Sequence, residues 1–555
     1  MFCAVISKPD FTLPLHVMGE PVFQYNRVDG KRVALLRSIA HKPIDDSFCK
    51  STAQGYSIFE GILLSHSTSQ VSEMIERDDH SQLSTIHGQF ACLHYNVATE
   101  ELRVYTNLSN NLRVYYYYLN DLFVAATSIK MIISTLKANG ITCSPDELGL
   151  RMMLSYGYML RNYTTIAEIR QLGVANILRI GITGLSQKPY FRYDTRIKHS
   201  SYRSCATDLK ELFTNAVNQG LKRDGDSRHF AFISGGLDSR LVVWTAHEQG
   251  VRDLDCLTFS QPDYLDETIA RQICQTLGYK HHFYSLEGGE YLKDLDANLA
   301  YHEGQIVLHG AAHLYAAIQT MPLQQYGIMH SGQIGDVIKG SYLQARGHTP
   351  VNFAAGAYST RLIHTLLQEV SKYRSDYANH EQFILENRGF NCITNGDLAC
   401  LDFGYSVSPF VEPAFMQYSI SVDPALRAGA RMYIAWMQRS YPKASKFKWE
   451  KFNCPVSTPY YLARLKYNFW RGTDKIKRKI TKQPNTLNMN PFDYWWSSNP
   501  SLKQHFNPLF TIPEPVSDII SKELEQDIAK LLAVGNLSEK LQAYTVIASL
   551  KYLLL

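Results

Sequence analysis

Two hydrophobic patterns divide the chain. In the first part, short apolar runs of strand type are separated by Gly, Asn and Asp, which are typical of turns. The clearest of these runs are Val33–Leu36, Phe90–Tyr95, Leu102–Tyr105, Val114–Leu119 and Leu122–Ala126. This pattern predicts a β-rich unit over residues 1–195.

From residue 206 onward, helical and strand patterns alternate. A helix is predicted over Ala206–Leu221, and strands are predicted at Phe230–Ile233, Asp255–Ser260 and Lys280–Ser285 with helical segments between them. This βαβαβ order predicts a parallel sheet that is covered by helices on both faces. Ligands of such sheets bind beyond the carboxyl ends of the strands.

The boundaries between these parts can also be read from the sequence. Residues 180–205 contain Gly181, Gly184 and Pro189, which interrupt periodicity and indicate a linker. Apolar residues recur at helical spacing from Ile519 to Leu532, and a second helix is expected at the end of the chain. We therefore expect three parts, at residues 1–195, 206–480 and 481–555, the last a helical extension.

The composition narrows the class of protein. A net charge of +5 on 555 residues is small and requires neither nucleic acid nor a membrane as partner. The ten cysteines form no Cys-x-x-Cys pair, which favours reduced cytosolic thiols over disulfides or zinc. We recognise no signal peptide, and the apolar tail Ala543–Leu555 is too short to span a bilayer. A cytoplasmic location is expected.

The most informative motif is Ser234-Gly-Gly-Leu-Asp-Ser239, which follows a predicted strand and opens a predicted helix. Adjacent glycines allow a ligand to approach the backbone, and the N–H groups of a helix start attract phosphate oxygens. Asp238 would repel bare phosphate unless a cation such as Mg²⁺ lay between them. The simpler alternative is a strand-to-helix connection with Ser and Asp as caps. The Gly-Lys-Ser/Thr of a Walker A loop is missing, so γ-phosphate transfer is not indicated.

This string resembles the PP-loop of the ATP pyrophosphatases, which split ATP into AMP and pyrophosphate. A second string, Ser331-Gly-Gln-Ile-Gly-Asp336, follows the predicted strand Gly327–His330. It resembles the Ser-Gly-x-Gly-x-Asp-Glu loop of asparagine synthetase-like enzymes, with Ile334 and Val337 as departures. By this resemblance the chain is expected to bind ATP and Mg²⁺.

The resemblance implies roles for particular residues. Asp238 and Asp336 would share the Mg²⁺ ion. The backbone at Ile233 and Phe259 would hold adenine. The residues expected to bind ATP are Ile233, Ser234, Gly235, Gly236, Leu237, Asp238, Ser239, Phe259, Ser260, Ser331 and Gly332.

Two further roles are expected by the same resemblance. Glu303 is the expected catalytic base with Tyr301 in reserve, and a solvated turn is the alternative for this segment. Lys448 would neutralise charge on the leaving pyrophosphate, with Lys446 and Lys451 as competing candidates and a solvated basic loop as the alternative.

The first unit has a resemblance of its own. The segment Leu83–Ile133 is similar to the glutaminase domain of asparagine synthetase-type amidotransferases, an Ntn-type fold of two stacked antiparallel sheets (αββα). That family uses an N-terminal Cys, an Asn-Gly-Glu string and an Arg-Asp pair. Here the corresponding positions read Met1-Phe-Cys3, Glu60-Gly-Ile62 and Thr106-Asn107. We therefore expect a retained scaffold without glutaminase activity, and Cys3 as a buried strand residue.

Together these resemblances imply an α/β protein in which Ntn-type sheets precede a Rossmann-like PP-loop domain. The function that follows is an ATP-dependent carbon-nitrogen ligase that adenylates a carboxylate and transfers ammonia or an amine to it. A polysaccharide, peptide or natural-product pathway is expected to supply the substrate. The alternatives are a glutamine-hydrolysing asparagine synthetase, a PP-loop tRNA-modifying enzyme supported by the basic run Lys475–Lys482, and a non-catalytic partner protein.

Overall fold

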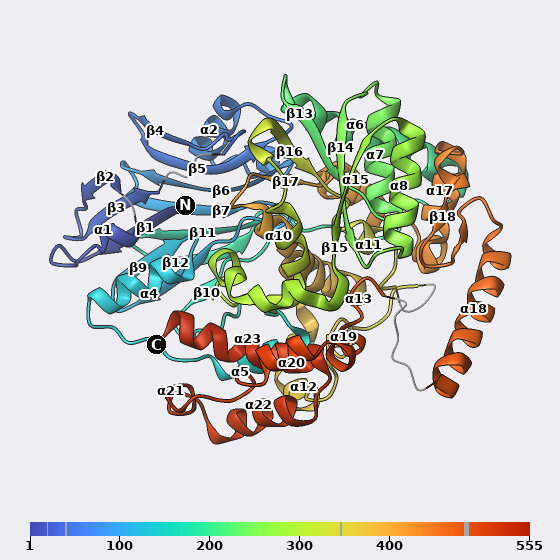
Figure 1. Ribbon diagram of the computed structural model, residues 1–555. Helices are drawn as coiled ribbons and strands as arrows, with labels where there is room; N and C mark the ends of the chain where they lie inside the picture. Colours follow the sequence, from blue (N-terminus) through green and yellow to red (C-terminus); the bar gives the residue numbers. More distant parts are fainter. Residues whose placement is uncertain (19, 39–41, 344–346, 482–487) are drawn as a thin grey trace.

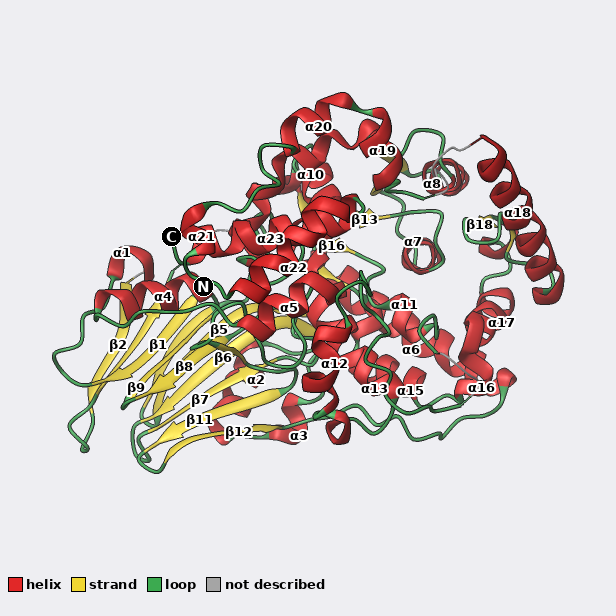
Figure 2. Ribbon diagram, turned by 90° about the horizontal axis from the view of Figure 1, so that it is seen from below, coloured by secondary structure: helices red, strands yellow, loops and turns green. Residues whose placement is uncertain are grey.

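Two antiparallel sheets, one parallel sheet and a helix-rich C-terminal part make up the chain (Figure 1). The computed structural model describes the chain except residues 19, 39–41, 344–346 and 482–487. Figure 2 shows the two antiparallel sheets stacked face to face on one side of the molecule, with most helices on the other. The predicted α/β fold class is confirmed.

The first antiparallel sheet has the order β10-β8-β9-β1-β3-β2, and the second has the order β12-β11-β7-β6-β5-β4. The strands of the first are β1 Phe2–Ser7, β2 Glu20–Asn26, β3 Arg32–Arg37, β8 Tyr115–Leu119, β9 Leu122–Ala126 and β10 Arg170–Gln171. Those of the second are β4 Phe48–Thr52, β5 Gly55–Leu63, β6 Gly88–Asn96, β7 Glu101–Thr106, β11 Asn176–Gly181 and β12 Gly184–Pro189.

Alternating apolar residues of both sheets form the core between them. Ala4 and Leu35 of the first sheet lie in one buried cluster with Leu93 and Leu178 of the second. The outer faces are covered by helices: α4, Ile129–Ala138, packs on the first sheet, and α2, Thr68–Arg77, packs on the second. This is the four-layer arrangement that the family resemblance implied.

The expected linker is shorter than predicted. Gly181 and Gly184 do not interrupt the fold but flank the tight turn of the β11–β12 hairpin. Gly184 has a φ of 102°, which only glycine adopts readily. Because α6 already begins at Tyr202, only residues 190–201 connect the hairpin to the helix.

The parallel sheet carries the region of the two loop motifs. Its order is β15-β14-β13-β16-β17, and all four pairings are parallel. The strands are β13 Arg228–Phe232, β14 Leu254–Ser260, β15 Lys280–Ser285, β16 Tyr326–His330 and β17 Ser406–Val407. Helices α6 Tyr202–Asp224, α7 Asp238–Glu248, α8 Leu265–Leu277 and α10 Ala312–Ile318 accompany it. Consequently the loops after β13 and β16 leave the same edge of the sheet side by side.

The remaining helices pack mainly around the second half of the chain. They are α1 Leu15–Met18, α3 His80–Leu83, α5 Glu147–Tyr156, α9 Leu299–His302, α11 Gly335–Ile338, α12 His364–Ser371, α13 His380–Phe383, the π-helical segment η5 Ile384–Ile393, α14 Asn395–Cys400, α15 Pro413–Ile420, α16 Pro424–Arg427, α17 Arg431–Ser440, α18 Tyr460–Thr481, α19 Phe492–Ser498, α20 Pro500–Phe506, α21 Glu514–Ser517, α22 Lys522–Val534 and α23 Leu537–Leu553. A small antiparallel pair, β18 Lys448–Trp449 and β19 Cys454–Pro455, precedes α18.

The C-terminal helices are part of the core. Leu541 and Val546 of α23 are fully buried, and α23 packs against α5 and α22. The predicted helical extension therefore packs against the middle of the chain. In the part of the chain that the structure describes, no helix combines the length and the apolar character needed to cross a membrane.

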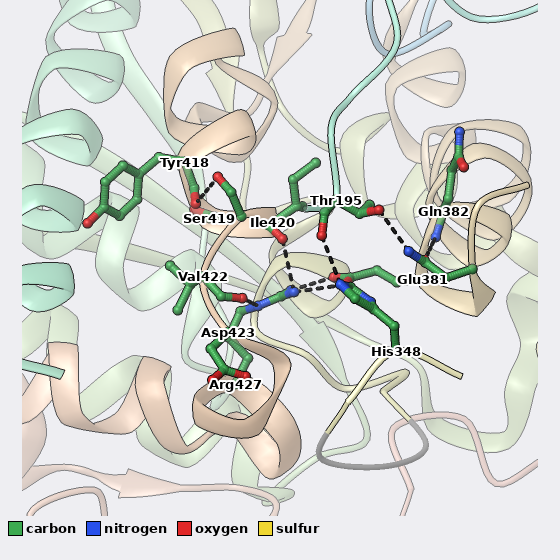
Figure 3. A network of polar contacts seen from close by, with 12 residues as sticks. Thr195, His348, Glu381, Gln382, Tyr418, Ser419, Ile420, Val422, Asp423 and Arg427 are labelled. Atoms are coloured by element: carbon green, nitrogen blue, oxygen red, sulfur yellow. Dashed lines mark hydrogen bonds and ion pairs between the residues drawn. The ribbon is translucent and has the colours of Figure 1, made fainter. Parts of the chain in front are cut away.

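A buried ion pair joins three segments that are distant in sequence (Figure 3). The Arg427 guanidinium at the end of α16 contacts the Glu381 carboxylate of α13, with one N–H···O distance of 2.8 Å, and both side chains are almost fully buried. Arg427 also donates to the backbone carbonyls of Ile420 and Val422. His348 lies 3.9 Å from the same carboxylate and contacts the carbonyl of Thr195.

We expect Arg427→Met to destabilise the protein by about 3–5 kcal/mol, because it leaves the Glu381 carboxylate buried without its partner. The double variant Arg427→Met/Glu381→Leu is expected to recover part of this loss, since no uncompensated charge remains. Urea denaturation followed by circular dichroism measures both. A single variant as stable as the wild type would contradict the assignment.

Candidate functional site

The Ser234–Ser239 loop connects β13 to α7 and is held by its own serines. The Ser239 hydroxyl accepts the N–H of Ser234 at 3.1 Å, and the Ser234 hydroxyl accepts the N–H of Gly236 at 3.1 Å. The N–H of Gly235 donates to the Asp266 carboxylate at 2.9 Å. These hydrogen bonds fix the loop in the absence of a ligand. Helix α7 then begins at Asp238, within the same motif.

The second loop, residues 331–336, lies in direct backbone contact with the first. A Cβ at Gly332 would lie 2.5 Å from the Ser239 nitrogen, and a Cβ at Gly335 would lie 2.5 Å from Cγ of Asp238. Both positions therefore require glycine. Ile334 has a φ of 67°, a left-handed conformation that is rare for a β-branched residue, and its side chain is buried. Ile334 therefore keeps a turn for which the resemblance expects glycine.

A pocket of about 450 Å³ opens where the two loops meet. Of the residues predicted to bind ATP or its metal ion, eight line the pocket: Ser234, Gly236, Asp238, Ser239, Phe259, Ser331, Gly332 and Asp336. Gly235, Leu237, Ile233 and Ser260 do not line it. The N–H of Ile233 donates to Leu257 and its carbonyl accepts from the Thr258 hydroxyl, so the sheet already uses the backbone predicted to hold adenine.

The other wall of the pocket comes from residues that the sequence did not single out. Arg388 of η5 donates to the carbonyl of Gly356 at 2.7 Å and to the Tyr342 hydroxyl at 3.1 Å. The Asn395 amide and one atom each of Gln333 and His313 are buried without a hydrogen-bond partner among the described residues. Such atoms are costly unless a ligand or water satisfies them. Gln333 belongs to the second loop motif, but no local motif marks Arg388, Asn395 or His313, because they reach the pocket only through tertiary packing.

Lys339 contacts both of the carboxylates that were predicted to share a metal ion. Its ammonium lies 2.8 Å from Oδ2 of Asp238 and 2.6 Å from Oδ1 of Asp336. Although burial alone would lower it, these carboxylates raise the pKa of Lys339 above its ordinary value. Burial raises the pKa of Asp238, whereas Lys339 holds the pKa of Asp336 below its ordinary value. The arrangement does not fit an Mg²⁺ ion held between these two carboxylates, because an ammonium already bridges them.

A second cluster of charges lies behind the first loop. Arg240 is fully buried and donates to the carbonyls of Gly235 and Lys448 at 3.0 and 2.5 Å. Burial raises the pKa of Glu450 to about 7 and that of Asp266 to about 6. One carboxylate oxygen of Glu450 is buried without a hydrogen-bond partner in the described chain. The carboxyl groups of Asp266 and Glu450 and the guanidinium of Arg240 thus support the first loop.

Of the three candidate lysines, Lys446 is exposed, and the other two differ in their relation to the pocket. Trp449 is buried, with its ring 6.0 Å from the Lys339 ammonium, whereas its strand neighbour Lys448 is exposed. Because successive side chains of a strand point to opposite sides, Lys448 is directed away from the site. Lys451 is exposed but close enough to lower the pKa of Asp336. The role predicted for Lys448 stays untested. Neither lysine lines the pocket, but the Lys451 ammonium lies 5.6 Å from the ring centroid of Trp449, on the side of Asp336, which favours Lys451.

The predicted base, Glu303, lies outside the pocket lining. Its buried carboxylate accepts from the Ser128 hydroxyl at 2.5 Å and from the backbone N–H groups of Ile129 and Lys130 at 2.6 and 3.1 Å. It thus holds the start of α4 in the first domain. Tyr301 packs against Tyr315 with ring centroids 5.3 Å apart, also outside the lining. These positions favour structural roles for both, and their catalytic roles stay predictions.

The residues that correspond to a glutaminase site are also engaged in the fold. Cys3 is fully buried in β1, and burial raises the pKa of its thiol well above the ordinary range. Asn107 donates to Asn111 at 2.7 Å, and Asn111 donates to Asp397 of α14 at 3.3 Å. The position after β7 therefore belongs to a buried polar network that connects the two domains.

Gly332→Ala is expected to separate the two loops, because its methyl group would overlap the backbone at Ser239. We expect a loss of about 1–3 kcal/mol in the free energy of unfolding, typical of overpacking, and weaker nucleotide binding. Urea denaturation and calorimetric titration with ATP measure the two effects. Gly347→Ala is the control, since a Cβ there meets no atom within 4 Å. Equal behaviour of both variants would contradict the predicted contact.

Glu450→Gln is expected to change the pH dependence of stability. As the pH rises from the ordinary carboxyl pKa to about 7, the unfolded chain loses this proton before the folded chain does. Wild-type stability therefore falls across this window, by at most about 1.4 kcal/mol per pH unit for one group. The variant is expected to gain stability relative to the wild type between pH 5 and about pH 7, measured by urea denaturation. Glu287→Gln, at an exposed position, is the control, and parallel curves for wild type and Glu450→Gln would contradict the prediction.

Comparison with known proteins adds one clear finding: residues 208–390 match the family model described as asparagine synthase. No curated protein matches the chain. Among solved structures, an allosteric regulatory enzyme of purine biosynthesis is similar at 10% identity, over 51% of this chain and 74% of that one, with a TM-score of 0.21.

Two further solved structures are similar to the chain. Glutamine phosphoribosylpyrophosphate amidotransferase from B. subtilis, complexed with ADP and GMP, is 11% identical over 70% of this chain and 90% of that one, with a TM-score of 0.21. NMN synthetase from Francisella tularensis is 15% identical over 40% and 96%, with a TM-score of 0.18. At this level the structural similarities add nothing to the fold described above. Residues 208–390 are therefore similar to the asparagine synthase family, over about a third of the chain.

Proposed function

We propose that this protein is an ATP-dependent amide-forming ligase that adenylates a carboxylate and transfers ammonia or an amine to it. One observation carries the proposal: the Ser234–Ser239 loop and the 331–336 loop meet at the carboxyl ends of β13 and β16 and open into a single pocket. This is the edge at which parallel sheets bind ligands. The asparagine synthase match covers both loops.

The proposed reaction has two steps. A carboxylate oxygen attacks the α-phosphorus of ATP, and the bond to the bridging oxygen breaks, so that pyrophosphate leaves with the electron pair. The amine nitrogen then attacks the acyl carbon, AMP leaves with the electrons of the C–O bond, and the nitrogen loses a proton. The first turn of α7, which begins at Asp238, offers N–H groups without helical partners and the positive end of the helix dipole to phosphate oxygens.

The cations around Asp336 suit a leaving pyrophosphate. Arg388 and Lys451 both lower the pKa of Asp336, after the larger effect of Lys339, so all three positive charges lie near this end of the pocket. A guanidinium can also hold a carboxylate in two hydrogen bonds. We therefore assign Lys451 to the charge that develops on pyrophosphate and Arg388 to an anionic group of the substrate.

The source of nitrogen is proposed to be free ammonia or an amine of the substrate itself. Residues 1–195 would then be a glutaminase-like scaffold, since Cys3 is buried in a central strand and the Asn-Gly-Glu string reads Glu60-Gly-Ile62. Residues 206–480 would be the ligase domain and residues 481–555 its helical cover. A substrate from a polysaccharide, peptide or natural-product pathway is proposed on the same ground.

Two of the three alternatives, both of them enzymes, have less support. A glutamine-hydrolysing asparagine synthetase requires a reactive thiol, and glutamate release that is lost in Cys3→Ala would establish it. A tRNA-modifying enzyme rests on the basic run Lys475–Lys482. The side chains of residues 474–481 and the whole of Lys482 lie outside the described residues.

ATP–pyrophosphate exchange with a panel of carboxylic acids tests the proposed function. Exchange is expected with at least one acid, and Lys451→Met is expected to lower its rate about 10²- to 10³-fold, as for the loss of one charge-stabilising donor. Lys448→Met is the matched control and is expected to leave the rate unchanged, because Lys448 points away from the pocket. Intact ATP binding without exchange by any acid would instead favour a non-catalytic partner protein.

A further inference from the structure

Lys339 is a departure from the loop pattern that this chain otherwise follows. The resemblance expects a second acid directly after Asp336, and this position is Val337, whose side chain is buried. Two residues later the chain has Lys339, at the end of α11. The loop has thus lost one negative charge and gained one positive charge within a single helical turn.

The surroundings of Lys339 fix the position of its ammonium. Only 7% of its side chain is exposed, and its stem lies among apolar residues that include Ile338 and Met432. The ammonium lies 5.9 Å from the ring centroid of Tyr433 and 6.0 Å from that of Trp449. Aromatic rings at this distance attract a cation. Displacing the ammonium would leave a buried charge without its carboxylate partners, which is costly.

The two carboxylates depend on Lys339 as much as it depends on them. Asp238 and Asp336 come from different loops, and the absence of a side chain at Gly335 lets them approach each other. Without a cation, two like charges at such a site repel, and one of them would take up a proton. With Lys339, the trio has a net charge of −1 instead of −2, counting two carboxylates and one ammonium.

We propose that Lys339 is a built-in counter-cation of the Asp238–Asp336 pair and replaces the divalent ion that two such carboxylates would otherwise share. Lys339 is a positioning residue in this role: it holds the carboxylates in place and keeps the two loops together before ligand binds. The free protein then has no divalent-cation site at this pair. The catalytic role of the Asp238–Asp336 pair rests on the proposed function, whereas the charge balance between this pair and Lys339 does not.

Divalent-cation binding to the nucleotide-free protein tests this inference. Mn²⁺ serves as the probe, and its binding is measured by electron paramagnetic resonance. Wild type is expected to show no Mn²⁺ site that is lost in Asp336→Asn. Lys339→Met is expected to gain an Mn²⁺ site that binds at least about tenfold more tightly than any residual Mn²⁺ binding by wild type, since two carboxylates without a counter-cation attract a divalent ion more strongly. The double variant Lys339→Met/Asp336→Asn is expected to lose this site.

Thermal unfolding gives a second readout for the same proteins. The melting temperature of Lys339→Met is expected to rise on addition of Mg²⁺, whereas those of wild type and Lys339→Arg are expected to stay constant. If Lys339→Met does not fold without a metal, its recovery by Mg²⁺ supports the inference and a failure to recover contradicts it. A wild-type Mn²⁺ site that disappears in Asp336→Asn would also overturn it.

These measurements need no ATP, so the two proposals fail separately. Absence of ATP–pyrophosphate exchange, together with a new Mn²⁺ site in Lys339→Met, would reject the proposed reaction and keep the role of Lys339. ATP–pyrophosphate exchange by a wild type that binds Mn²⁺ at Asp336 would keep the proposed reaction and reject the role of Lys339.

Discussion

The backbone contact between the two loops is the constraint on which the site depends. Gly332 and Gly335 bring the 331–336 loop within van der Waals reach of Asp238 and Ser239, at a distance that no other residue would allow. This contact exists because β13 and β16 are parallel neighbours, which end at the same edge of the sheet. The pocket, the carboxylate pair and the position of Lys339 all follow from it.

Several buried charges in this half of the molecule are paired with an opposite charge. The pair of Arg427 and Glu381 joins α16 to α13, and the carbonyl of Arg427 lies against Gly340, directly after Lys339. Lys339 itself balances two carboxylates, and Arg240 supports the first loop beside Glu450 and Asp266. Since unpaired charges are costly away from water, each pair fixes the relative position of the segments that carry it. The rigidity of the pocket thus has an electrostatic as well as an apolar basis.

Besides resembling a glutaminase domain, the first domain makes structural contacts with the second. Glu303 of the second half caps α4 of the first, and Asn111 of the first reaches Asp397 of the second. These contacts are buried and polar, so the domains form a specific interface. Glu303 was a candidate through the family resemblance alone; in the structure, burial raises the pKa of its carboxyl group, which accepts hydrogen bonds from the start of α4.

The sequence by itself determined the β-rich first part, the alternating second part and the first loop of the site. Period-two and helical patterns predicted the sheets, and the Ser234–Ser239 string predicted a ligand loop, because both signals are local in the chain. Tertiary structure alone decided which side chains complete the pocket. Arg388, Asn395 and His313 carry no local signature. The alternation of β18 places exposed Lys448 opposite buried Trp449, and only the meeting of two distant loops places Lys339 between Asp238 and Asp336. Contacts between remote segments depend on strand order and packing, which local sequence patterns do not encode.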